Sequence, residues 1–327
     1  MVLPATPARP FGAVLTAMVT PMTPDGAVDL DAAARLAGRL VDDGNDGVVL
    51  SGTTGESPTT HAPEKAELVR AVVEAVGGRA AVLAGAGSND TDHAVRMAEQ
   101  AAEAGADGLL VVSPYYSRPS QEGLYRHFAA VADATDLPVM LYDVPGRTAV
   151  RIGAETYARI AAHERVVATK DASGDVYSAA KLAASTGLAV YSGDDTLLLP
   201  FLAHGGAGVV SVAAHAVGGR FAEVVRRFDA GDHAGAIEVF LTTTPVIDAL
   251  NGAGFQAVMA KAAVEALGIV DNRHLRLPNV GASEDEAALV RRPRRRRPAA
   301  RGGARPGRAI AATQDIYPSA QPRQEAP

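Results

Sequence analysis

Short apolar segments recur along the chain, each followed by polar or glycine-rich residues and then by a segment with helical periodicity. The apolar segments are rich in valine and leucine and do not alternate with polar residues, which is typical of strands buried on both faces. The pattern predicts eight such strands, at 13–19, 47–50, 80–83, 108–112, 138–142, 166–169, 188–191 and 208–212.

The segments between these strands carry apolar residues at helical spacing. In residues 31–43, for example, Leu36 and Leu40 fall on one face of a helix. Gly44 and Gly105 suit positions just after a helix end, where a left-handed backbone is common. Helices are predicted at 31–43, 63–76, 91–104, 121–134 and 156–163.

Eight alternating strand–helix units predict an α/β protein with a (β/α)8 TIM barrel over residues 11–217. A doubly wound open sheet is the alternative, because it also alternates strands and helices. The count of eight favours the barrel, and so do the polar residues that consistently follow the strands.

The sequence changes character after the barrel. Two further helical patterns, 235–248 and 255–267, predict a C-terminal helical region over 218–290, and residues 1–10 precede the barrel as an extension. The tail 291–327 contains ten arginines and six prolines with almost no apolar periodicity. We expect this tail to be disordered.

Charge is unevenly distributed along the chain. The net charge is −6, yet the tail holds ten of the 31 basic residues and only two of the 37 acidic ones, a balance of +8. The remaining body therefore carries −14, which makes nucleic acid an improbable partner for it. A polybasic tail that binds nucleic acid or anionic surfaces is the alternative, and a solvated tail without function is favoured.

The composition excludes several classes of protein. The chain has no cysteine, so disulfides, thiolate metal sites and cysteine nucleophiles are absent. Its apolar runs are shorter than the roughly 18 residues of a membrane span, and its first residues have no leucine-rich core of a signal peptide. We therefore expect a cytoplasmic protein with no membrane partner.

Lys170 is the strongest chemical candidate, because it ends an apolar strand where barrel enzymes place catalytic groups. Desolvation favours the neutral amine of a lysine, and this amine can attack a ketone or aldehyde to form a Schiff base. The alternative is a buried ion pair with Asp171 or Asp194.

Other strand ends carry groups that suit the same chemistry. Tyr142 ends the preceding strand and can shuttle protons, although a core tyrosine is the alternative. Thr53 and Thr54 lie in a glycine-flanked turn whose amides and hydroxyls can hold a carboxylate, or which is simply a tight turn. Arg147 can grip a carboxylate, with a surface salt bridge as the alternative. Tyr116 suits either an interface or catalysis.

Metal chemistry is poorly supported by the histidines and carboxylates. Only His215 lies near a strand end, whereas a metal-dependent aldolase needs a cluster of such ligands. Asp194 and Asp195 can form a metal pair, but a hydrogen-bonded loop anchor is favoured. We expect no metal.

Four segments together resemble the dihydrodipicolinate synthase family of pyruvate-dependent class I aldolases, which also contains the N-acetylneuraminate lyases. They are Gly-Thr-Thr-Gly-Glu-Ser at 52–57, the stretch from Ser-Pro-Tyr-Tyr to Gly-Leu-Tyr at 113–125, Tyr to Arg-Thr at 142–148, and Lys-Asp-Ala-Ser-Gly at 170–174. The resemblance covers residues 11–290.

The resemblance implies that Lys170 forms an imine with the keto carbon of pyruvate, so that no separate cofactor is needed. Thr53 and Thr54 would hold the pyruvate carboxylate, with the Thr53 hydroxyl also in a proton relay. Tyr142 would be the acid and base of imine formation. Tyr116 would complete the relay by reaching across a dimer interface into the neighbouring site. The chain would thus be a homo-oligomer, at least a dimer and by family analogy a tetramer.

The resemblance also implies the second substrate and the product. Arg147 would bind the carboxylate of L-aspartate 4-semialdehyde, and Gly193 and Val210 would line the pocket. The product would be 4-hydroxy-tetrahydrodipicolinate, a precursor of lysine and diaminopimelate. Paired threonines and Arg147 favour this acceptor. N-acetylneuraminate lyases, hydroxy-oxoglutarate aldolases and sugar-acid dehydratases remain alternatives.

Two departures from the family pattern stand out. Many relatives carry Asn-Pro-x-Pro before the lysine that matches Lys261, whereas this chain reads Gln-Ala-Val-Met-Ala there, and we expect an effect on assembly. Lysine-inhibited members share Asn89 and Tyr115 but carry an acidic residue in place of His93 and often a histidine in place of Lys65. Added positive charge would repel lysine, so weak feedback inhibition is predicted.

Overall fold

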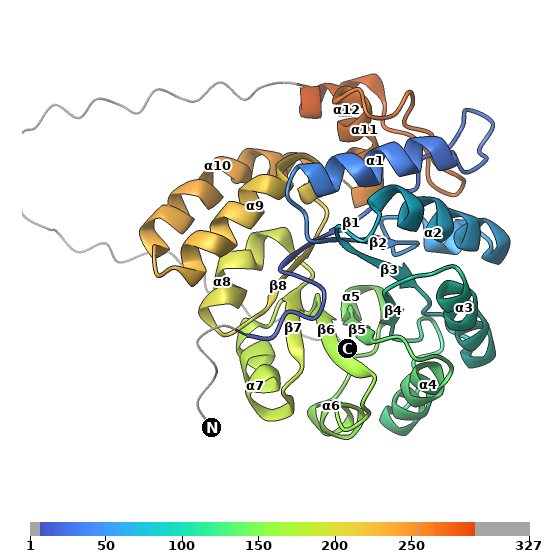
Figure 1. Cartoon of the computed structure of the whole chain (residues 1–327), viewed down its shortest axis with the longest axis vertical. Coiled ribbons are helices and arrows are strands. Elements are labelled where there is room, and N and C mark those ends of the chain that lie inside the picture. The colour runs from blue at the N-terminus through green and yellow to red at the C-terminus, as the bar shows by residue number, and fades with distance from the viewer. Residues whose placement is uncertain (1–6, 253, 292–327) are drawn as a thin grey trace, which may run out of the picture. The chain divides into compact units, whose positions relative to one another are not determined.

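The computed structural model describes residues 7–252 and 254–291. Eight parallel strands pair in chain order and close into a barrel, because β1 also pairs with β8 (Figure 1). The strands are β1 Val14–Ala17, β2 Gly47–Leu50, β3 Ala81–Gly85, β4 Gly108–Val112, β5 Val139–Asp143, β6 Val166–Asp171, β7 Ala189–Ser192 and β8 Gly208–Ser211. The predicted barrel is therefore confirmed, and the alternative of an open doubly wound sheet is wrong.

Nearly every strand residue is buried, which explains the unbroken apolar runs of the sequence. Side chains that point into the barrel form one apolar cluster, with Leu15, Leu110, Met140 and Tyr191 among its members. Side chains that point outward pack under the helices in a second cluster. The barrel interior is thus filled, so a ligand can reach only the ends of the strands.

The helices around the barrel are α1 Leu30–Asp42, α2 Ala62–Val76, α3 Thr91–Glu103, α4 Gln121–Asp133, α5 Pro145–Thr148, α6 Ala154–Ile160, α7 Val176–Thr186, α8 Leu198–Ala203 and α9 Ala214–Asp229, with single turns η1 Ser57–Thr59 and η2 Asp195–Leu197. The five predicted helices correspond to α1, α2, α3, α4 and α6 and are confirmed within about three residues at each end. In α1, the Asp29 carboxylate caps the helix by accepting from the Ala32 amide, and Leu36 and Leu40 are buried. Gly44 follows α1 with a left-handed backbone, at φ +96°.

Three further helices follow the barrel: α10 His233–Asn251, α11 Gln256–Ala266 and α12 Glu284–Arg291. α9 and α10 pack against each other, with the rings of Phe221 and Phe240 stacked at 6.4 Å. The predicted domain boundary after residue 217 falls inside α9, at the non-helical backbone of Val217. The predicted extension 1–10 is described from residue 7 onward, and of the tail only Arg291 lies within the described residues.

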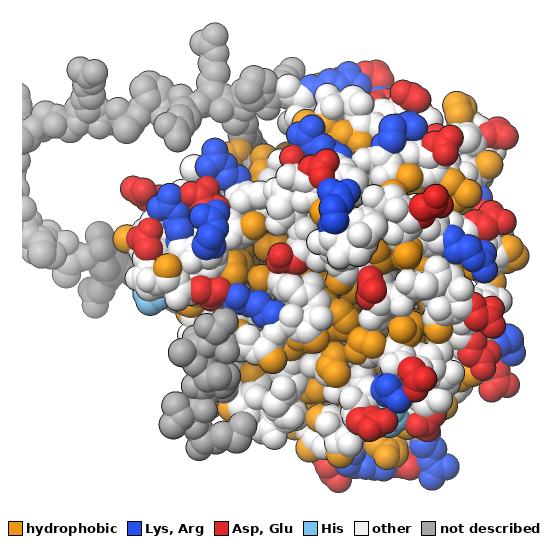
Figure 2. Space-filling model, viewed as in Figure 1, with side chains coloured by type: hydrophobic (Ala, Val, Ile, Leu, Met, Phe, Trp, Pro, Cys, Tyr) orange, Lys and Arg blue, Asp and Glu red, His pale blue; other side chains and the backbone are white. Residues whose placement is uncertain are grey.

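On the face viewed in Figure 2, described basic side chains lie interspersed with acidic ones toward the periphery, and apolar side chains lie nearer its centre. None of the helices in the described part of the chain is both long and apolar enough to cross a membrane.

Candidate active site

A cavity of about 650 Å³ opens at the carboxyl ends of the barrel strands. Residues from the loops after β2, β4 and β5 line it together with residues from the C-terminal region. Those that matter for its chemistry are Thr53, Glu56, Tyr115, Tyr116, Tyr142, Arg147, Phe255, Pro278 and Asn279. Four predicted site residues thus share one cavity: Thr53, Tyr116, Tyr142 and Arg147.

Lys170 lies beside Tyr142 at the end of the neighbouring strand. The two residues are register partners of β5 and β6, and the Lys170 Nζ lies 4.4 Å from the centre of the Tyr142 ring. The Lys170 side chain is buried, at 6% exposed. Among the described residues its Nζ has no carboxylate partner, and the two predicted partners, Asp171 and Asp194, accept instead from the Ser173 and Thr196 amides. The predicted alternative of a buried ion pair is therefore wrong.

Gly193 leaves room for the Lys170 side chain. A Cβ at Gly193 would lie 3.1 Å from the Lys170 Cε and 2.8 Å from the Ala172 Cβ, so any larger residue would displace the lysine. Val210 is fully buried among the apolar side chains of the barrel interior, in the same cluster as Tyr142. Gly193 therefore lies against Lys170, Val210 lies in the barrel interior, and neither residue lines the cavity.

Thr53 and Thr54 lie in a tightly held loop after β2. The Glu56 amide donates to the Thr53 carbonyl at 3.1 Å, and the Thr20 hydroxyl donates to the Gly55 carbonyl at 2.7 Å. Thr53 lines the cavity, while Thr54 is 4% exposed. Neither threonine hydroxyl has a hydrogen-bond partner among the residues that the structure describes. Buried polar groups usually have one, so these hydroxyls are available to a ligand.

Arg147 lies in the four-residue helix α5, which begins with Pro145 and ends where Ala149 takes a left-handed backbone. Its guanidinium lies 5.8 Å from the centre of the Phe255 ring. It forms no salt bridge within residues 7–252 and 254–291, so the predicted alternative of a surface ion pair is wrong. The arginine thus presents its charge to the cavity with an aromatic ring beside it.

Tyr116 also lines the cavity, but most of its side chain is open to solvent, at 90% exposed. Its backbone is left-handed, at φ +73°, which is uncommon for a residue with a large side chain. Such local strain persists where the surrounding structure fixes it, and it occurs often at functional sites. The exposed ring is consistent with a contact outside this chain.

The chain matches the family model described as "Dihydrodipicolinate synthetase family" over residues 10–293. The chain belongs to this family.

Relatives in the family cover most of the chain. A 4-hydroxy-tetrahydrodipicolinate synthase of Bifidobacterium animalis subsp. lactis is 54% identical over 282 residues, which are 86% of this chain and 92% of that protein. The 4-hydroxy-tetrahydrodipicolinate synthase 2 of Streptomyces coelicolor is 53% identical over 287 residues, 88% of this chain and 95% of that protein.

Solved structures of dihydrodipicolinate synthases are similar to this chain over most of its length. The dihydrodipicolinate synthase of Bacillus anthracis superposes with a TM-score of 0.82 at 41% identity, covering 86% of this chain and 96% of that one. The enzyme of Cyanidioschyzon merolae, solved with lysine bound, superposes with a TM-score of 0.83 at 40% identity, covering 87% and 97%.

Lys261 is a site neighbour that the sequence did not reveal. We expected a change near it to affect assembly, but the structure places its Nζ 2.5 Å from the Glu56 Oε1, in the loop that carries Thr53 and Thr54. One signal was available: in α11 the lysine is surrounded by alanine, valine and methionine, which predicts burial and therefore a partner. The sequence of α11 does not indicate which carboxylate pairs with Lys261.

The remaining candidate ligands of a metal are held in ordinary hydrogen bonds. His215 accepts from the Val19 amide at 3.0 Å, and burial lowers its pKa to about 4. Asp195 accepts from the Ala213 amide and from the Asn251 side chain, so it anchors the loop after β7. No group of three or more potential ligands is close enough to hold a metal ion within the described part of the chain.

A buried pair of carboxylates lies directly behind the catalytic candidates. Asp143 follows Tyr142 and Asp171 follows Lys170, and the two aspartates are register partners on the opposite face of their strands. Burial raises the pKa of Asp143 to about 7, and the negative charge of Asp171 contributes to the rise. One proton is thus retained near neutrality beside the site.

Proposed function

We propose that this chain condenses pyruvate with L-aspartate 4-semialdehyde to form 4-hydroxy-tetrahydrodipicolinate, a lyase-type reaction of the lysine and diaminopimelate pathway. Relatives more than 50% identical over most of their length carry this activity in their names. The observation that carries the proposal is the position of Lys170 beside a tyrosine at the end of a barrel strand, where it is buried and has no ion-pair partner in residues 7–252 and 254–291.

The first half of the reaction belongs to Lys170 and Tyr142. The Lys170 amine adds to the keto carbon of pyruvate, and loss of water from the carbinolamine leaves an imine. The Tyr142 hydroxyl, which has no hydrogen-bond partner among the described residues, gives and takes the protons of these steps. The hydroxyls and amides of Thr53 and Thr54 hold the pyruvate carboxylate.

The second half joins the two substrates. The imine loses a methyl proton to become an enamine, whose carbon attacks the aldehyde of the acceptor. The amino group of the acceptor then attacks the imine carbon, releases Lys170 and closes the ring. Arg147 holds the acceptor carboxylate, and the Phe255 ring limits where its guanidinium can lie.

The reaction as proposed needs no cofactor besides the lysine imine. Dialysis against a chelator is therefore expected to leave turnover unchanged. We also propose a cytoplasmic location, which accords with pyruvate and an amino-acid aldehyde as substrates.

We propose that the active form is at least a dimer and by family analogy a tetramer, in which Tyr116 enters the site of a neighbouring subunit. A monomeric variant of dihydrodipicolinate synthase superposes with a TM-score of 0.82, so the fold itself does not require assembly. Mixing inactive Y116F with inactive K170M is expected to restore activity, because a mixed dimer has one site with Lys170 from one chain and Tyr116 from the other. Absence of recovery in mixed dimers would contradict a role for Tyr116 across the interface.

The acceptor is tested by measuring pyruvate consumption with the purified full-length chain. L-aspartate 4-semialdehyde and N-acetylmannosamine are offered in parallel, with K170M as the control for non-enzymatic loss. Turnover with aspartate semialdehyde alone is the expected result. Turnover with N-acetylmannosamine instead would overturn the proposed acceptor and retain the imine chemistry.

A further inference from the structure

The loop that carries Thr53 and Thr54 is bounded by two residues in an unfavourable backbone conformation. Ser51 and Glu56 have left-handed backbones, at φ +51° and +58°, although neither is glycine. A left-handed backbone brings the Cβ too close to the neighbouring carbonyl oxygen. The conformation must therefore be held by contacts from outside the loop.

Those contacts come from the C-terminal region and converge on the Glu56 carboxylate. Its Oε1 lies 2.5 Å from the Lys261 Nζ, and its Oε2 accepts from the Arg276 amide at 3.0 Å. The Lys261 ammonium also donates to the His274 carbonyl at 2.6 Å. Lys261 and Glu56 are 2% and 1% exposed, so solvent does not weaken this ion pair.

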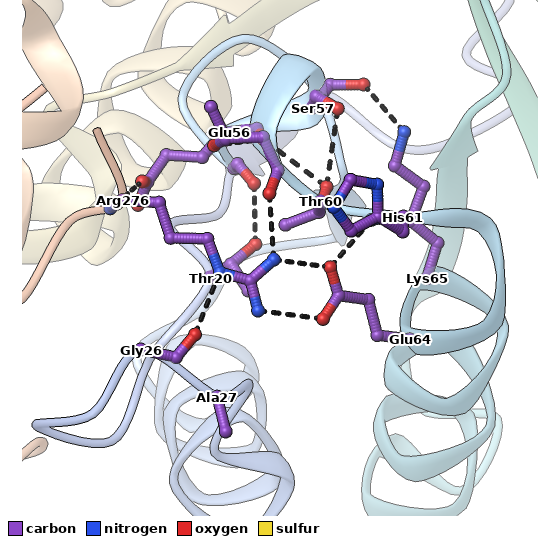
Figure 3. A network of polar contacts seen from close by, with 12 residues as sticks. Thr20, Gly26, Ala27, Glu56, Ser57, Thr60, His61, Glu64, Lys65 and Arg276 are labelled. Atoms are coloured by element: carbon purple, nitrogen blue, oxygen red, sulfur yellow. Dashed lines mark hydrogen bonds and ion pairs between the residues drawn. The ribbon is translucent and has the colours of Figure 1, made fainter. Parts of the chain in front are cut away.

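The Arg276 side chain fixes the same segment to the loops around the site. Its guanidinium binds both oxygens of Glu64, at 2.5 and 2.8 Å, and donates to the carbonyls of Gly26 and Thr59 at 2.8 Å. Figure 3 shows Arg276 between Glu56 and Glu64, with the Thr20 and Gly26 loop beside it. The arginine beside it holds the pKa of Glu64 below its usual range.

A displacement of Glu56 would also displace Thr53 and Thr54, because hydrogen bonds within the loop close the turn that contains these residues. Its amide donates to the Thr53 carbonyl at 3.1 Å, and the Ser57 amide donates to the Gly52 carbonyl at 3.1 Å, so the turn closes on itself. The loop has little free space, because a Cβ at Gly55 would lie 3.0 Å from the Ser51 amide nitrogen. The position of the Thr53 and Thr54 amides and hydroxyls therefore depends on where Glu56 is held.

We propose that Lys261, Arg276 and Glu56 are positioning residues for pyruvate, which hold the carboxylate-binding loop in its productive shape from the C-terminal region. This inference rests on the proposed function, because Thr53 and Thr54 hold the pyruvate carboxylate there. It assigns to the C-terminal helices a part in substrate binding that their sequence does not suggest.

The test measures how much pyruvate is needed to form the imine. The full-length chain is incubated with increasing pyruvate and reduced with borohydride, and the pyruvate adduct is quantified by mass spectrometry. The main variant is E56Q/K261M, which removes both charges and leaves no unpaired buried ion. R276M loosens the same segment and leaves only the partly exposed Glu64 without its cation, so it replaces the double variant should that not fold.

R273M is the matched control. Arg273 is an arginine of the same C-terminal segment, and it bonds to the Ala282 carbonyl and pairs with Glu265 at 2.6 Å, within that region and away from Glu56. It therefore reports the effect of loosening the C-terminal region without releasing the loop.

We expect the pyruvate concentration for half-maximal adduct to rise by about 10-fold or more in E56Q/K261M, and by less than about 2-fold in R273M. Excess pyruvate should restore the adduct to the wild-type yield, and the KM for aspartate semialdehyde should stay within about 2-fold. A folded variant with unchanged half-saturation, or with a lower yield that excess pyruvate does not restore, would overturn the inference alone. A wild-type chain that forms no pyruvate adduct would overturn the proposed function and the inference with it.

Discussion

Two buried lysines of this chain differ in one respect that decides their chemistry. Lys170 is 6% exposed and Lys261 is 2% exposed, so water is largely excluded from both. Lys261 has a carboxylate at 2.5 Å and a carbonyl at 2.6 Å, whereas within the described residues the Lys170 Nζ has no such partner and lies over the face of the Tyr142 ring. An ammonium fixed by a carboxylate is a structural element, and an amine left without such a partner can react with a ketone.

The polar groups around the two lysines also differ in whether they have hydrogen-bond partners. Near Lys261, Arg276 bonds directly to both glutamates: its amide donates to Glu56 and its guanidinium donates to Glu64 (Figure 3). The hydroxyls of Thr53 and Tyr142 have no partner in the described residues, although both line the cavity. Polar groups without partners are uncommon in folded proteins, and these two hydroxyls lie where a substrate would supply the missing bonds.

The largest predicted effect is the loss of activity when the Lys170 amine is removed. K170M is expected to lower kcat by about 1,000-fold or more, because no other group can form the imine. K181M is the matched control, since Lys181 lies over the Tyr177 ring and away from the cavity. Steady-state turnover of pyruvate with aspartate semialdehyde measures both. Retention of more than a tenth of the activity in K170M would show that another lysine is the nucleophile.

The next effect concerns the acceptor. R147M is expected to raise the KM for aspartate semialdehyde by about 10- to 100-fold, because the carboxylate of the acceptor loses its cation. The pyruvate dependence of adduct formation should change little. R151M serves as the control, because Arg151 is half-exposed and pairs with Asp175 at 3.5 Å. An equal rise in both substrates' requirements would place Arg147 in a general structural role.

Replacing Lys261 should lower the stability of the fold more than replacing Lys170, although replacing Lys170 is expected to have the larger effect on activity. K261M leaves the buried Glu56 carboxylate without its cation and is expected to destabilise the fold by about 3–5 kcal/mol. K170M removes a buried amine that has no ion pair, so its free energy of unfolding should change by less than about 1 kcal/mol or increase. Thermal unfolding of the two variants side by side tests this. A larger loss in K170M than in K261M would contradict the assignment.

The barrel strands could be predicted because their residues are buried on both faces, as in β8, where all four residues are buried. Helix α1 could be predicted because its cap, its apolar stripe and its final glycine agree. Helices α5, α7 and α8 were not among the predicted helices. Four and six residues in α5 and α8 are too few for a helical period to show, whereas α7 has 11 residues and was missed despite its length. Six candidate site residues could be selected from the polar ends of strands, which converge in any closed parallel barrel. They are Thr53, Thr54, Tyr116, Tyr142, Arg147 and Lys170.

The contribution of the C-terminal region could not be found in this way. Arg276 and Glu56 are 220 positions apart, and nothing in the pattern of either segment indicates the other. Phe255, Pro278 and Asn279 line the cavity from loops whose course depends on packing after the barrel is complete. Local periodicity predicts elements, whereas contacts between distant loops depend on the assembled fold.

The smallest predicted effect tests the carboxylates behind the site. The pKa of Asp143 is raised to about 7 in the folded chain, so the protonated form is favoured and the cost of its ionisation grows as the pH rises from about 4 to 7. D143N should therefore raise the melting temperature at pH 8 by about 2–4 °C or more, and by less at pH 5. Calorimetry at both pH values checks this, with exposed Asp271 as the control in D271N. Equal shifts at the two pH values would show that the effect is not due to ionisation.

The most direct test of the central claim is to locate the adduct among the four lysines of the chain, Lys65, Lys170, Lys181 and Lys261. The full-length protein is reduced with borohydride in the presence of pyruvate, digested and mapped by mass spectrometry. We predict a pyruvate adduct on Lys170 alone, with Lys261 unmodified although both side chains are buried. An adduct on Lys261, or on none of the four, would contradict the account.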